Sequence, residues 1–244
     1  ASRGAFAALL VDGSVVTWGD ARCGADSAAV RDALEGGVSS IVSTDGAFAA
    51  LKTSGSVVTW GNHEFGGDSA AVAAELLEGV SQVFATSSAF VAIKQQGAVV
   101  SWGQPHQGGD TSSVRERLGE GIRNVYHTEG AFAAVLQSGA VVTWGSPEFG
   151  GDSSAVSELL AQGVQSIHAT RSAFAAICSD GSLATWGSGR CGGNSSVIQE
   201  HVPDHANLVL SAHGFCTVLT GDDLLAIPGF RRLITPLLEQ LEGT

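Results

Sequence analysis

Residues 47–61 read AFAALKTSGSVVTWG, and this phrase decides the fold because the chain repeats it along its length. The tryptophan that ends the phrase recurs every 42 residues, at Trp18, Trp60, Trp102, Trp144 and Trp186. A phenylalanine near its start keeps the same interval, at Phe6, Phe48, Phe90, Phe132 and Phe174. Internal repeats of roughly 20 to 50 residues are typical of propellers and solenoids, so the chain is predicted to be an array of such units.

Each copy of the phrase predicts a β-hairpin. Two apolar runs flank a dipeptide ending in glycine, at Asp12-Gly13, Ser54-Gly55, Gln96-Gly97, Ser138-Gly139 and Asp180-Gly181. Glycine in the second place supplies the positive φ of a tight two-residue turn. Val57 and Val58 point to opposite faces of their strand, because side chains alternate along it. Both faces of the hairpin are therefore apolar, and such a hairpin must lie between neighbours, as the sheets of a propeller do.

A third strand is predicted before each hairpin, and a short helix after it. The strands cover residues 38–44, 80–86, 122–128 and 164–170, and residues 207–210 continue the series. The helices cover residues 27–37, 69–79, 111–121 and 153–163, each preceded by an aspartate that can cap its amides: Asp26, Asp68, Asp110 and Asp152. Apolar residues four apart, such as Val72 and Leu76, give each helix one narrow apolar stripe, and a glycine such as Gly79 ends it.

These units predict a mostly β fold, namely a β-propeller of about six three-stranded blades with short helices in the inter-blade connections. One repeat array covers residues 1–228, its first unit lacks an inner strand, and its sixth unit, at 207–228, is degenerate. An open arc of the same units is the alternative. Residues 229–244 form a C-terminal tail, in which Thr235 and Pro236 begin a short helix.

Composition argues against several classes of function. The net charge is −12 and the lysines are Lys52 and Lys94, which disfavours nucleic-acid binding, because phosphates attract clustered lysine and arginine. No apolar run reaches the roughly 18 residues of a transmembrane helix, and no secretory leader is visible. The chain contains no methionine, even at position 1, so we expect a soluble, processed chain, with organellar import and secretion both open.

The four cysteines do not predict a disulfide framework in a chain of this size. Cys23 and Cys191 hold the same repeat position, each within Arg-Cys-Gly, and they could pair only if the array curls until its ends meet. We expect two free loop thiols. Cys178 and Cys216 fall in predicted strands and are interpreted as small core residues.

Residues 164–187, VQSIHATRSAFAAICSDGSLATWG, resemble the repeat of the regulator of chromosome condensation family. That repeat ends in a similar Asp-Gly and Trp-Gly phrase followed by a glycine-rich turn, here Gly66-Gly67-Asp68 and its copies, and the resemblance extends to about Pro228. It implies a β-propeller, commonly of seven blades, and says little about function. This chain departs from the family in its shorter repeat, its helical connections and its smaller number of units. It has no counterpart of the exchange factor's catalytic insertion and no ubiquitin-ligase domain, so neither activity carries over.

No cofactor, metal site or catalytic group is predicted. Each Gly-Gly-Asp turn offers one carboxylate, whereas calcium takes about six to eight oxygen ligands, and helix capping already accounts for the aspartates. The tryptophans recur at identical places, which favours core packing over a ligand cage. His201 and His205 are four residues apart, but Pro203 lies between them and breaks a helical metal-binding face. No serine or cysteine has the context of a nucleophile.

The positions that vary most between units follow each Trp-Gly, and they predict a protein-binding face. The fold does not need these residues to differ, and equivalent loops of a propeller share one face. Phe65 and Phe149 are apolar within polar loops and suit protein contacts; the alternative is that they tuck under their own loops. A second candidate is the C-terminal helix, which could instead pack on the last blade. The candidate residues are Arg22, His63, Glu64, Phe65, His106, Gln107, Glu148, Phe149 and Arg190 in the loops, with Leu237, Leu238 and Leu241 in the helix.

These features favour a non-enzymatic scaffold or accessory subunit of a larger complex that binds protein partners. A secreted protein that plugs an enzyme's active site with its loop face is the alternative, which the resemblance to a β-lactamase-inhibiting branch of the family implies. A guanine-nucleotide-exchange-like regulator is a weaker alternative, because the catalytic insertion is missing.

Overall fold

The computed structural model describes residues 1–119, 121–194, 206–211 and 214–219, and they form a row of small antiparallel sheets. Four of these sheets have three strands, in the orders β3-β4-β5, β6-β7-β8, β9-β10-β11 and β12-β13-β14, while β1-β2 and β15-β16 are two-stranded as described. The strands are β1 Ala5–Leu9, β2 Val15–Gly19, β3 Val38–Ser43, β4 Ala47–Lys52, β5 Val57–Gly61, β6 Val80–Ala85, β7 Ala89–Lys94, β8 Val99–Gly103, β9 Ile122–His127, β10 Ala131–Leu136, β11 Val141–Gly145, β12 Val164–Ala169, β13 Ala173–Cys178, β14 Leu183–Gly187, β15 Ala206–Ser211 and β16 Gly214–Leu219.

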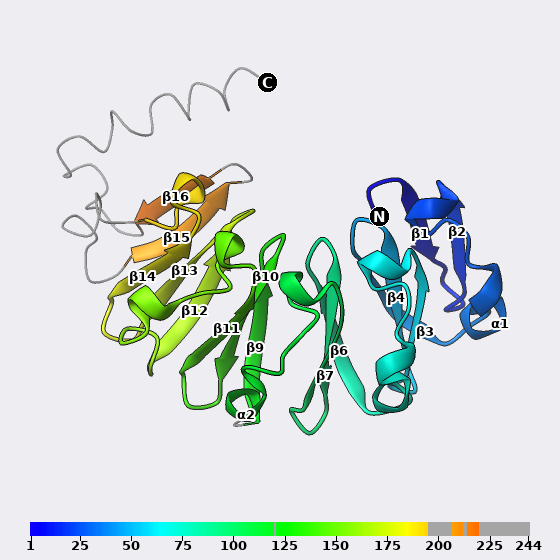
Figure 1. Ribbon diagram of the computed structural model, residues 1–244, viewed down its shortest axis with the longest axis horizontal. Coiled ribbons are helices and arrows are strands. Elements are labelled where there is room, and N and C mark those ends of the chain that lie inside the picture. The colour runs from blue at the N-terminus through cyan, green and yellow to red at the C-terminus, as the bar shows by residue number, and fades with distance from the viewer. Residues whose placement is uncertain (120, 195–205, 212–213, 220–244) are drawn as a thin grey trace, which may run out of the picture.

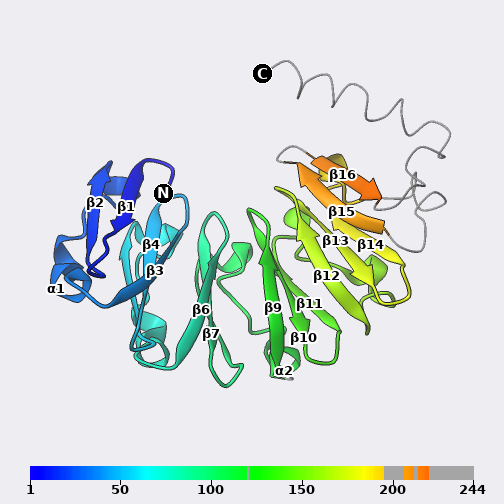
Figure 2. The same cartoon turned by 180° about the vertical axis from the view of Figure 1, so that it is seen from behind.

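The sheets follow one another like the blades of a propeller, but the ring is not closed. Figures 1 and 2 show β1-β2 at one end of an arc and β15-β16 at the other, with the remaining blades between them. The prediction of a mostly β propeller is confirmed, and the arrangement is the open arc that was the alternative to a six-bladed ring. The end of the degenerate sixth unit, residues 220–228, and the predicted C-terminal helix lie outside the described residues.

The hairpin turns contain one more residue than the sequence predicted. The Leu10 amide donates to the Ser14 carbonyl (2.8 Å) and the Gly13 amide donates to the Leu10 carbonyl (3.0 Å), which leaves a three-residue loop. Gly13 has a φ of 82°, and no non-glycine residue in the described part of the chain has a positive φ. A two-residue type I′ turn needs positive φ at both central residues, so Asp12 rules it out. The observed loop is a tight turn followed by a left-handed glycine, and the predicted role of the glycine is unchanged.

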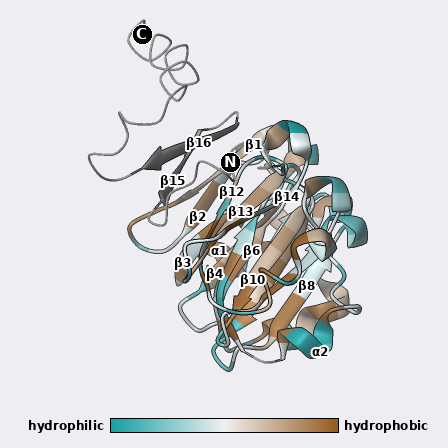
Figure 3. Cartoon of the chain, turned by 90° about the vertical axis from the view of Figure 1, so that its left-hand side faces the viewer, coloured by the Kyte–Doolittle hydropathy of each residue, from teal (hydrophilic) through white to brown (hydrophobic). Residues whose placement is uncertain are grey.

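The core lies between the blades. One face of each middle strand carries small residues, such as Ala131 and Ala133, and these pack against the aromatic face of the next blade, which includes Phe174 and Trp186. Within each described unit the phenylalanine and tryptophan rings are stacked, with centroids 5.2–5.3 Å apart. Figure 3 shows the apolar strands inside and the hydrophilic connections outside. Stacked aromatic pairs of this kind add to the stability that their burial provides.

Four of the five tryptophans are buried as predicted, and each bonds to the preceding unit. The indole nitrogens of Trp60, Trp102, Trp144 and Trp186 donate to glycine carbonyls of that unit at 3.0–3.1 Å. Trp18 differs, because its side of the first blade faces no other blade among the described residues, and it is 51 % exposed. The prediction of a buried ring is therefore wrong for Trp18.

A row of backbone hydrogen bonds joins the turns that link inner and middle strands. The Arg3 amide donates to the Asp45 carbonyl (2.9 Å), and the Asp45 amide donates to the Ser87 carbonyl (2.8 Å). The row continues from the Ser87 amide to the Glu129 carbonyl (2.8 Å) and from the Glu129 amide to the Arg171 carbonyl (3.0 Å). Each blade is thus tied to the next at the same point of the repeat.

The connections between blades contain shorter helices than the sequence predicted. They are η2 Ala28–Val30 with α1 Arg31–Leu34, η4 Ala70–Leu76, α2 Arg115–Leu118 and η7 Ser154–Val156. The four aspartates accept hydrogen bonds from the amides two residues later, for example the Ala70 amide to Asp68 Oδ1 at 2.8 Å. They stabilise the turn that leads into each connection; Asp26, Asp68 and Asp152 stand one residue before a helix cap, and Asp110 stands four residues before the cap of α2. Gly79 ends its connection with a φ of 74°, as predicted.

The described residues contain no disulfide. Cys23 and Cys191 are free thiols in blades near opposite ends of the arc, and Cys178 is buried in β13. Within the same residues, no helix is long and apolar enough to span a bilayer.

Candidate interaction face

Five equivalent loops, each following a Trp-Gly pair, gather at one end of the blades. Each loop contains a single 3-10 turn: η1 Ala21–Cys23, η3 His63–Phe65, η5 Pro105–Gln107, η6 Pro147–Phe149 and η8 Gly189–Cys191. They lie beside the turns that join inner and middle strands, because the Asn62 amide donates to the Gly46 carbonyl and the Ser146 amide to the Gly130 carbonyl, both at 2.9 Å. We call the surface formed by these loops and turns the loop face.

The backbone of each loop is anchored in the same way. A hydroxyl from the neighbouring turn donates to the carbonyl at the fourth position of the loop, as from Thr44 to Phe65 (2.9 Å) and from Thr128 to Phe149 (2.9 Å). Ser2, Thr86 and Thr170 do the same in the other units, at 2.8–3.0 Å. The loop face therefore has a fixed backbone that does not depend on its variable side chains.

Different residues begin the 3-10 turns. Asp20 and Asn62 accept hydrogen bonds from the amides of Arg22 and Glu64, each at 2.9 Å. In the next two loops a proline, Pro105 or Pro147, takes the first position of the turn, where its missing amide has no intrahelical partner to lose. The same backbone is thus compatible with quite different sequences.

The first and second positions of each 3-10 turn carry the side chains that a partner would meet. Six of the predicted contact residues are exposed there: Arg22, His63, Glu64, His106, Glu148 and Arg190. The Arg22 side chain is 87 % exposed and forms an ion pair with Asp20 at 2.8 Å. Its hydrogen bonds hold the pKa of the Asp20 carboxyl below the usual value.

Phe65 and Phe149 are placed differently from the prediction. Both are half-buried and pack against the inter-blade cores, so they take the alternative of tucking under their own loops. A Cβ atom at Gly46 would lie 2.9 Å from the Phe65 ring, and one at Gly130 would lie 2.8 Å from the Phe149 ring. Gln107 holds the same position with a polar contact, since Ser87 Oγ donates to its Oε1 at 2.9 Å. These three residues support the loop face from below.

A pairing within the repeat could have revealed this role from the sequence. In units whose loop carries phenylalanine, the neighbouring turn has a glycine, as in Gly46 with Phe65. In the unit whose loop carries Gln107, the equivalent residue of the turn is Ser88. An ion pair that was not predicted from the sequence joins two blades on the loop face, between Arg171 Nε and Glu129 Oε2 at 2.8 Å. Its signal is a pair of opposite charges at one repeat position in adjacent units.

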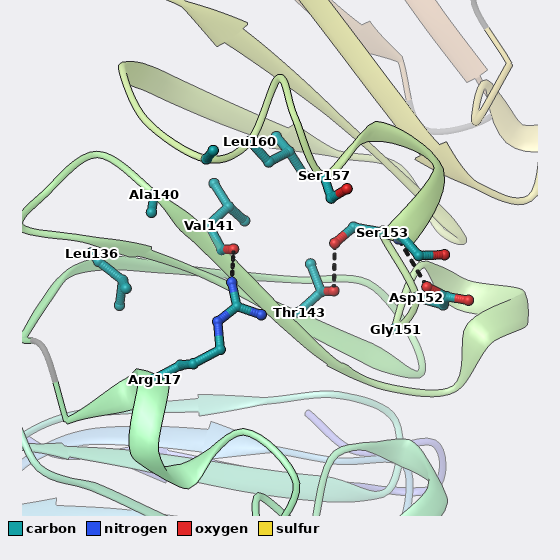
Figure 4. A pocket seen from close by; sticks show the side chains of 12 residues that line it. Arg117, Leu136, Ala140, Val141, Thr143, Gly151, Asp152, Ser153, Ser157 and Leu160 are labelled. Carbon is teal, nitrogen blue, oxygen red and sulfur yellow. Dashed lines mark hydrogen bonds between the residues drawn. The ribbon is translucent and has the colours of Figure 1, made fainter.

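Two cavities among the described residues lie beside the connections between blades. One of about 700 Å³ lies between β11 and the following connection, and Figure 4 shows Arg117 donating to the Val141 carbonyl (3.0 Å) within it. A cavity of about 520 Å³ occupies the equivalent place in the first unit. Because such a cavity lies at the same place in two units, we interpret it as a gap left by the architecture. Among the described residues, no three potential metal ligands cluster.

No protein family model matches the chain, and no curated protein matches its sequence significantly. The structure of human WBSCR16 matches with a TM-score of 0.51 and 16 % identity, over 89 % of this chain and 65 % of that one. Yeast RCC1 (Prp20), solved with Kap60, matches with a TM-score of 0.50 and 17 % identity, over 90 % of this chain and 63 % of that one.

The fold is an RCC1-like β-propeller. The ectodomain of the receptor kinase CR4 from Physcomitrella patens also matches this open propeller, with a TM-score of 0.50 and 18 % identity, over 86 % of this chain and 56 % of that one. The open propeller spans less than two thirds of each of these structures. At such identities the likeness concerns the fold alone. The candidate residues of the C-terminal helix, Leu237, Leu238 and Leu241, lie outside the described residues.

Proposed function

We propose that this open propeller is a non-enzymatic protein-binding module that acts as a scaffold or accessory subunit of a larger complex. The observation that carries the proposal is the loop face. Its five loops share one anchored backbone and present different exposed side chains. A fixed backbone lowers the entropy cost of binding, and variable side chains provide specificity.

The charges on the loop face indicate what a partner must offer. Arginine side chains stand near the two ends of the row, at Arg22 and Arg190, and acidic side chains stand between them, at Glu64 and Glu148. A complementary partner presents acidic groups at the ends of its contact surface and basic groups between them. The net charge of −12 adds a general attraction for basic proteins. We propose no cofactor and no nucleic-acid partner.

Structures of the same fold give this proposal general support. Yeast Prp20 has been solved with Kap60 bound, and its binding to Gsp1p and histones has been described. Those partners belong to that protein. For this chain they illustrate that a propeller of this type serves as a protein-binding platform.

The proposal is tested by capturing partners from the native source with the whole chain as bait, followed by mass spectrometry. A loop-face variant carries Arg22→Glu, Glu64→Lys, Glu148→Lys and Arg190→Glu. A control variant makes the same four kinds of exchange at exposed residues of the connections: Arg31→Glu, Glu78→Lys, Arg115→Glu and Glu158→Lys.

We expect the loop-face variant to lose a specific partner that the wild type and the control variant both retain. Retention of every partner by the loop-face variant would contradict the proposal, and so would their loss from the control variant alone. If the captured partner is an enzyme whose turnover stops on binding, the chain is an inhibitor rather than a scaffold.

A further inference from the structure

The cavity beside β11 in the fourth unit is lined by one basic and one acidic side chain. Arg117 comes from the connection before this blade, and Asp152 comes from the connection after it. Figure 4 shows Thr143 of β11 between them. The volume of about 700 Å³ is that of a small-molecule site. The architecture leaves a gap at this place in two units, but the first-unit cavity is lined by two acidic residues and one arginine, so the charges differ.

The protein uses only part of the Arg117 guanidinium. Its Nη2 donates to the Val141 carbonyl at 3.0 Å, and this is its one hydrogen bond to the described residues. An arginine has five N–H donors in a planar fork, so four donors remain. The ion pairs among the described residues belong to Arg22 and Arg171, so no carboxylate of that part of the chain pairs with Arg117. Arg117 can therefore bind the carboxylate of a ligand.

Asp152 provides the opposite charge. The Ser154 amide donates to Asp152 Oδ1 at 2.9 Å, and this hydrogen bond holds the pKa of the Asp152 carboxyl below its usual value. The side chain is therefore ionised at neutral pH. It is exposed and forms no ion pair with the described residues. Asp152 can therefore accept hydrogen bonds from the ammonium group of a ligand.

The outer edge of β11 is unpaired between these two charges. The Val141 amide donates to the Leu160 carbonyl at 2.9 Å, and the Val141 carbonyl accepts from Arg117, so both groups point away from β10. Alternate residues of an antiparallel strand share this direction, so the N–H and C=O of Thr143 point outward too. Neither group has a hydrogen-bond partner in the part of the chain that the structure describes. A ligand with an amide group can bond to this edge.

The spacing of the charges indicates the length of the ligand. Arg117 is bonded at Val141, and Val141 and Thr143 are about 7 Å apart along the strand. Asp152 lies beyond Thr143, since the hydroxyl of its neighbour Ser153 is 2.9 Å from the Thr143 hydroxyl. The charges are thus on the order of 10 Å apart. An extended dipeptide with a hydrogen bond at each end spans about 12 Å, whereas a single amino acid is shorter and has no amide for Thr143.

We infer that this cavity binds a zwitterionic dipeptide, which lies antiparallel to β11 along its outer edge. The dipeptide carboxylate binds Arg117, its ammonium group binds Asp152, and its amide bonds to the backbone of Thr143. Leu136 and Leu160 also line the cavity and favour apolar side chains. The opposite charges favour a ligand with two free termini over an internal segment of a protein, which has neither. The inference does not rest on the proposed function of the loop face.

The test is an NMR titration of the ¹⁵N-labelled whole chain with leucyl-leucine, followed by its amide shifts. N-acetylation of the dipeptide removes its ammonium group, and amidation removes its carboxylate. We expect each change to weaken binding about tenfold or more, because hydrogen bonds between charged groups are lost. Leucine alone should also bind at least about tenfold more weakly, because it cannot span the two charges. The Thr143 amide should shift with the free dipeptide.

Protein variants assign each end of the dipeptide. Arg117→Met should weaken binding of leucyl-leucine about tenfold and leave binding of the amidated form unchanged, since that form has no carboxylate. Asp152→Asn keeps an acceptor for the Ser154 amide and should weaken binding of the free dipeptide but not of the acetylated form. Arg31→Met, in the cavity of the first unit, is the control and should change neither. The amide spectrum of each variant also reports whether it is folded.

Four results would overturn the inference. They are the absence of binding, equal affinity for the free and the capped dipeptides, amide shifts confined to other blades, and equal loss of binding in Arg117→Met and Arg31→Met. Binding of leucine as tight as that of the dipeptide would overturn the assignment of the edge of Thr143.

Discussion

A side chain added at Gly130 should destabilise the chain by displacing the ring of Phe149. A Cβ at this position would lie 2.8 Å from one ring carbon and 3.2 Å from the Phe149 Cβ, closer than real contacts allow. The φ of Gly130 is not positive, so Gly130→Ser introduces steric conflict without backbone strain. Serine is also the residue that the chain itself uses at the equivalent positions Ser88 and Ser172.

Two routes of relaxation set the size of the effect. If the ring stays in place, overpacking costs about 1–3 kcal/mol. If the half-buried ring swings into solvent, the loss is about half of the 1.5–3 kcal/mol that full burial of a phenylalanine provides. The cheaper route wins, so we expect a loss of about 1–1.5 kcal/mol in the free energy of unfolding. For a chain of this size that lowers the Tm by about 2–6 °C.

The assay is thermal and urea unfolding of four proteins: the wild type, Gly130→Ser, Phe149→Gln and the double variant. The double variant reproduces the combination of serine and glutamine that the third unit carries at Ser88 and Gln107, and removal of the ring relieves the clash with serine, so the two changes should couple favourably by about 0.5–1 kcal/mol. Gly36→Ser is the control, because a Cβ there meets no atom within 4 Å. A neutral Gly130→Ser variant, or strictly additive changes in the cycle, would refute the steric account of the Phe149 site.

Three further predictions concern the repeat. Trp144→Phe removes the indole N–H that donates to the buried Gly108 carbonyl at 3.1 Å, so it should lower the free energy of unfolding in urea by about 1–3 kcal/mol. Trp18→Phe is the control, because Trp18 is exposed at the equivalent position, and it should change that free energy by less than about 0.5 kcal/mol. Thr128→Val removes the hydroxyl that anchors the fourth loop at 2.9 Å, and hydrogen exchange should speed up in residues 146–150 and not in 62–66; equal rates in both loops would contradict the anchoring role. Burial lowers the pKa of His168 below its usual value of 6.5, so the folded state favours the neutral ring; its contribution to stability is complete above pH 6.5 and is lost as the pH falls through the lowered pKa. The urea midpoint should therefore fall between pH 7.5 and pH 5, and His168→Gln should reduce that dependence.

The repeat made the blades predictable from sequence. Trp60 and its three buried equivalents occupy the same surroundings, so one environment favours the same residue in four units. The hairpin glycines were placed correctly, but their loop length was not, because a two-residue and a three-residue loop both need a glycine with positive φ. The sequence therefore predicted where the turn glycines lie, but not that each turn has three residues.

Other features depend on contacts that no local pattern contains. The exposure of Trp18 follows from its place at the end of the row of described blades. Phe65 was ambiguous because an apolar side chain in a polar loop suits both a partner and a neighbouring turn. Only its contact with Gly46, on another segment, decides between them.

The row of backbone hydrogen bonds through Arg3, Asp45, Ser87, Glu129 and Arg171 joins equivalent turns of successive blades, so the neighbouring loops are held at a regular spacing. The turns of Asp45, Ser87 and Glu129 cannot shift alone, because each is bonded to the turns on both sides. A partner that spans several loops must match this spacing as well as the chemistry of single side chains. Any change that tightens or relaxes the curvature of the arc would then alter all of those contacts together.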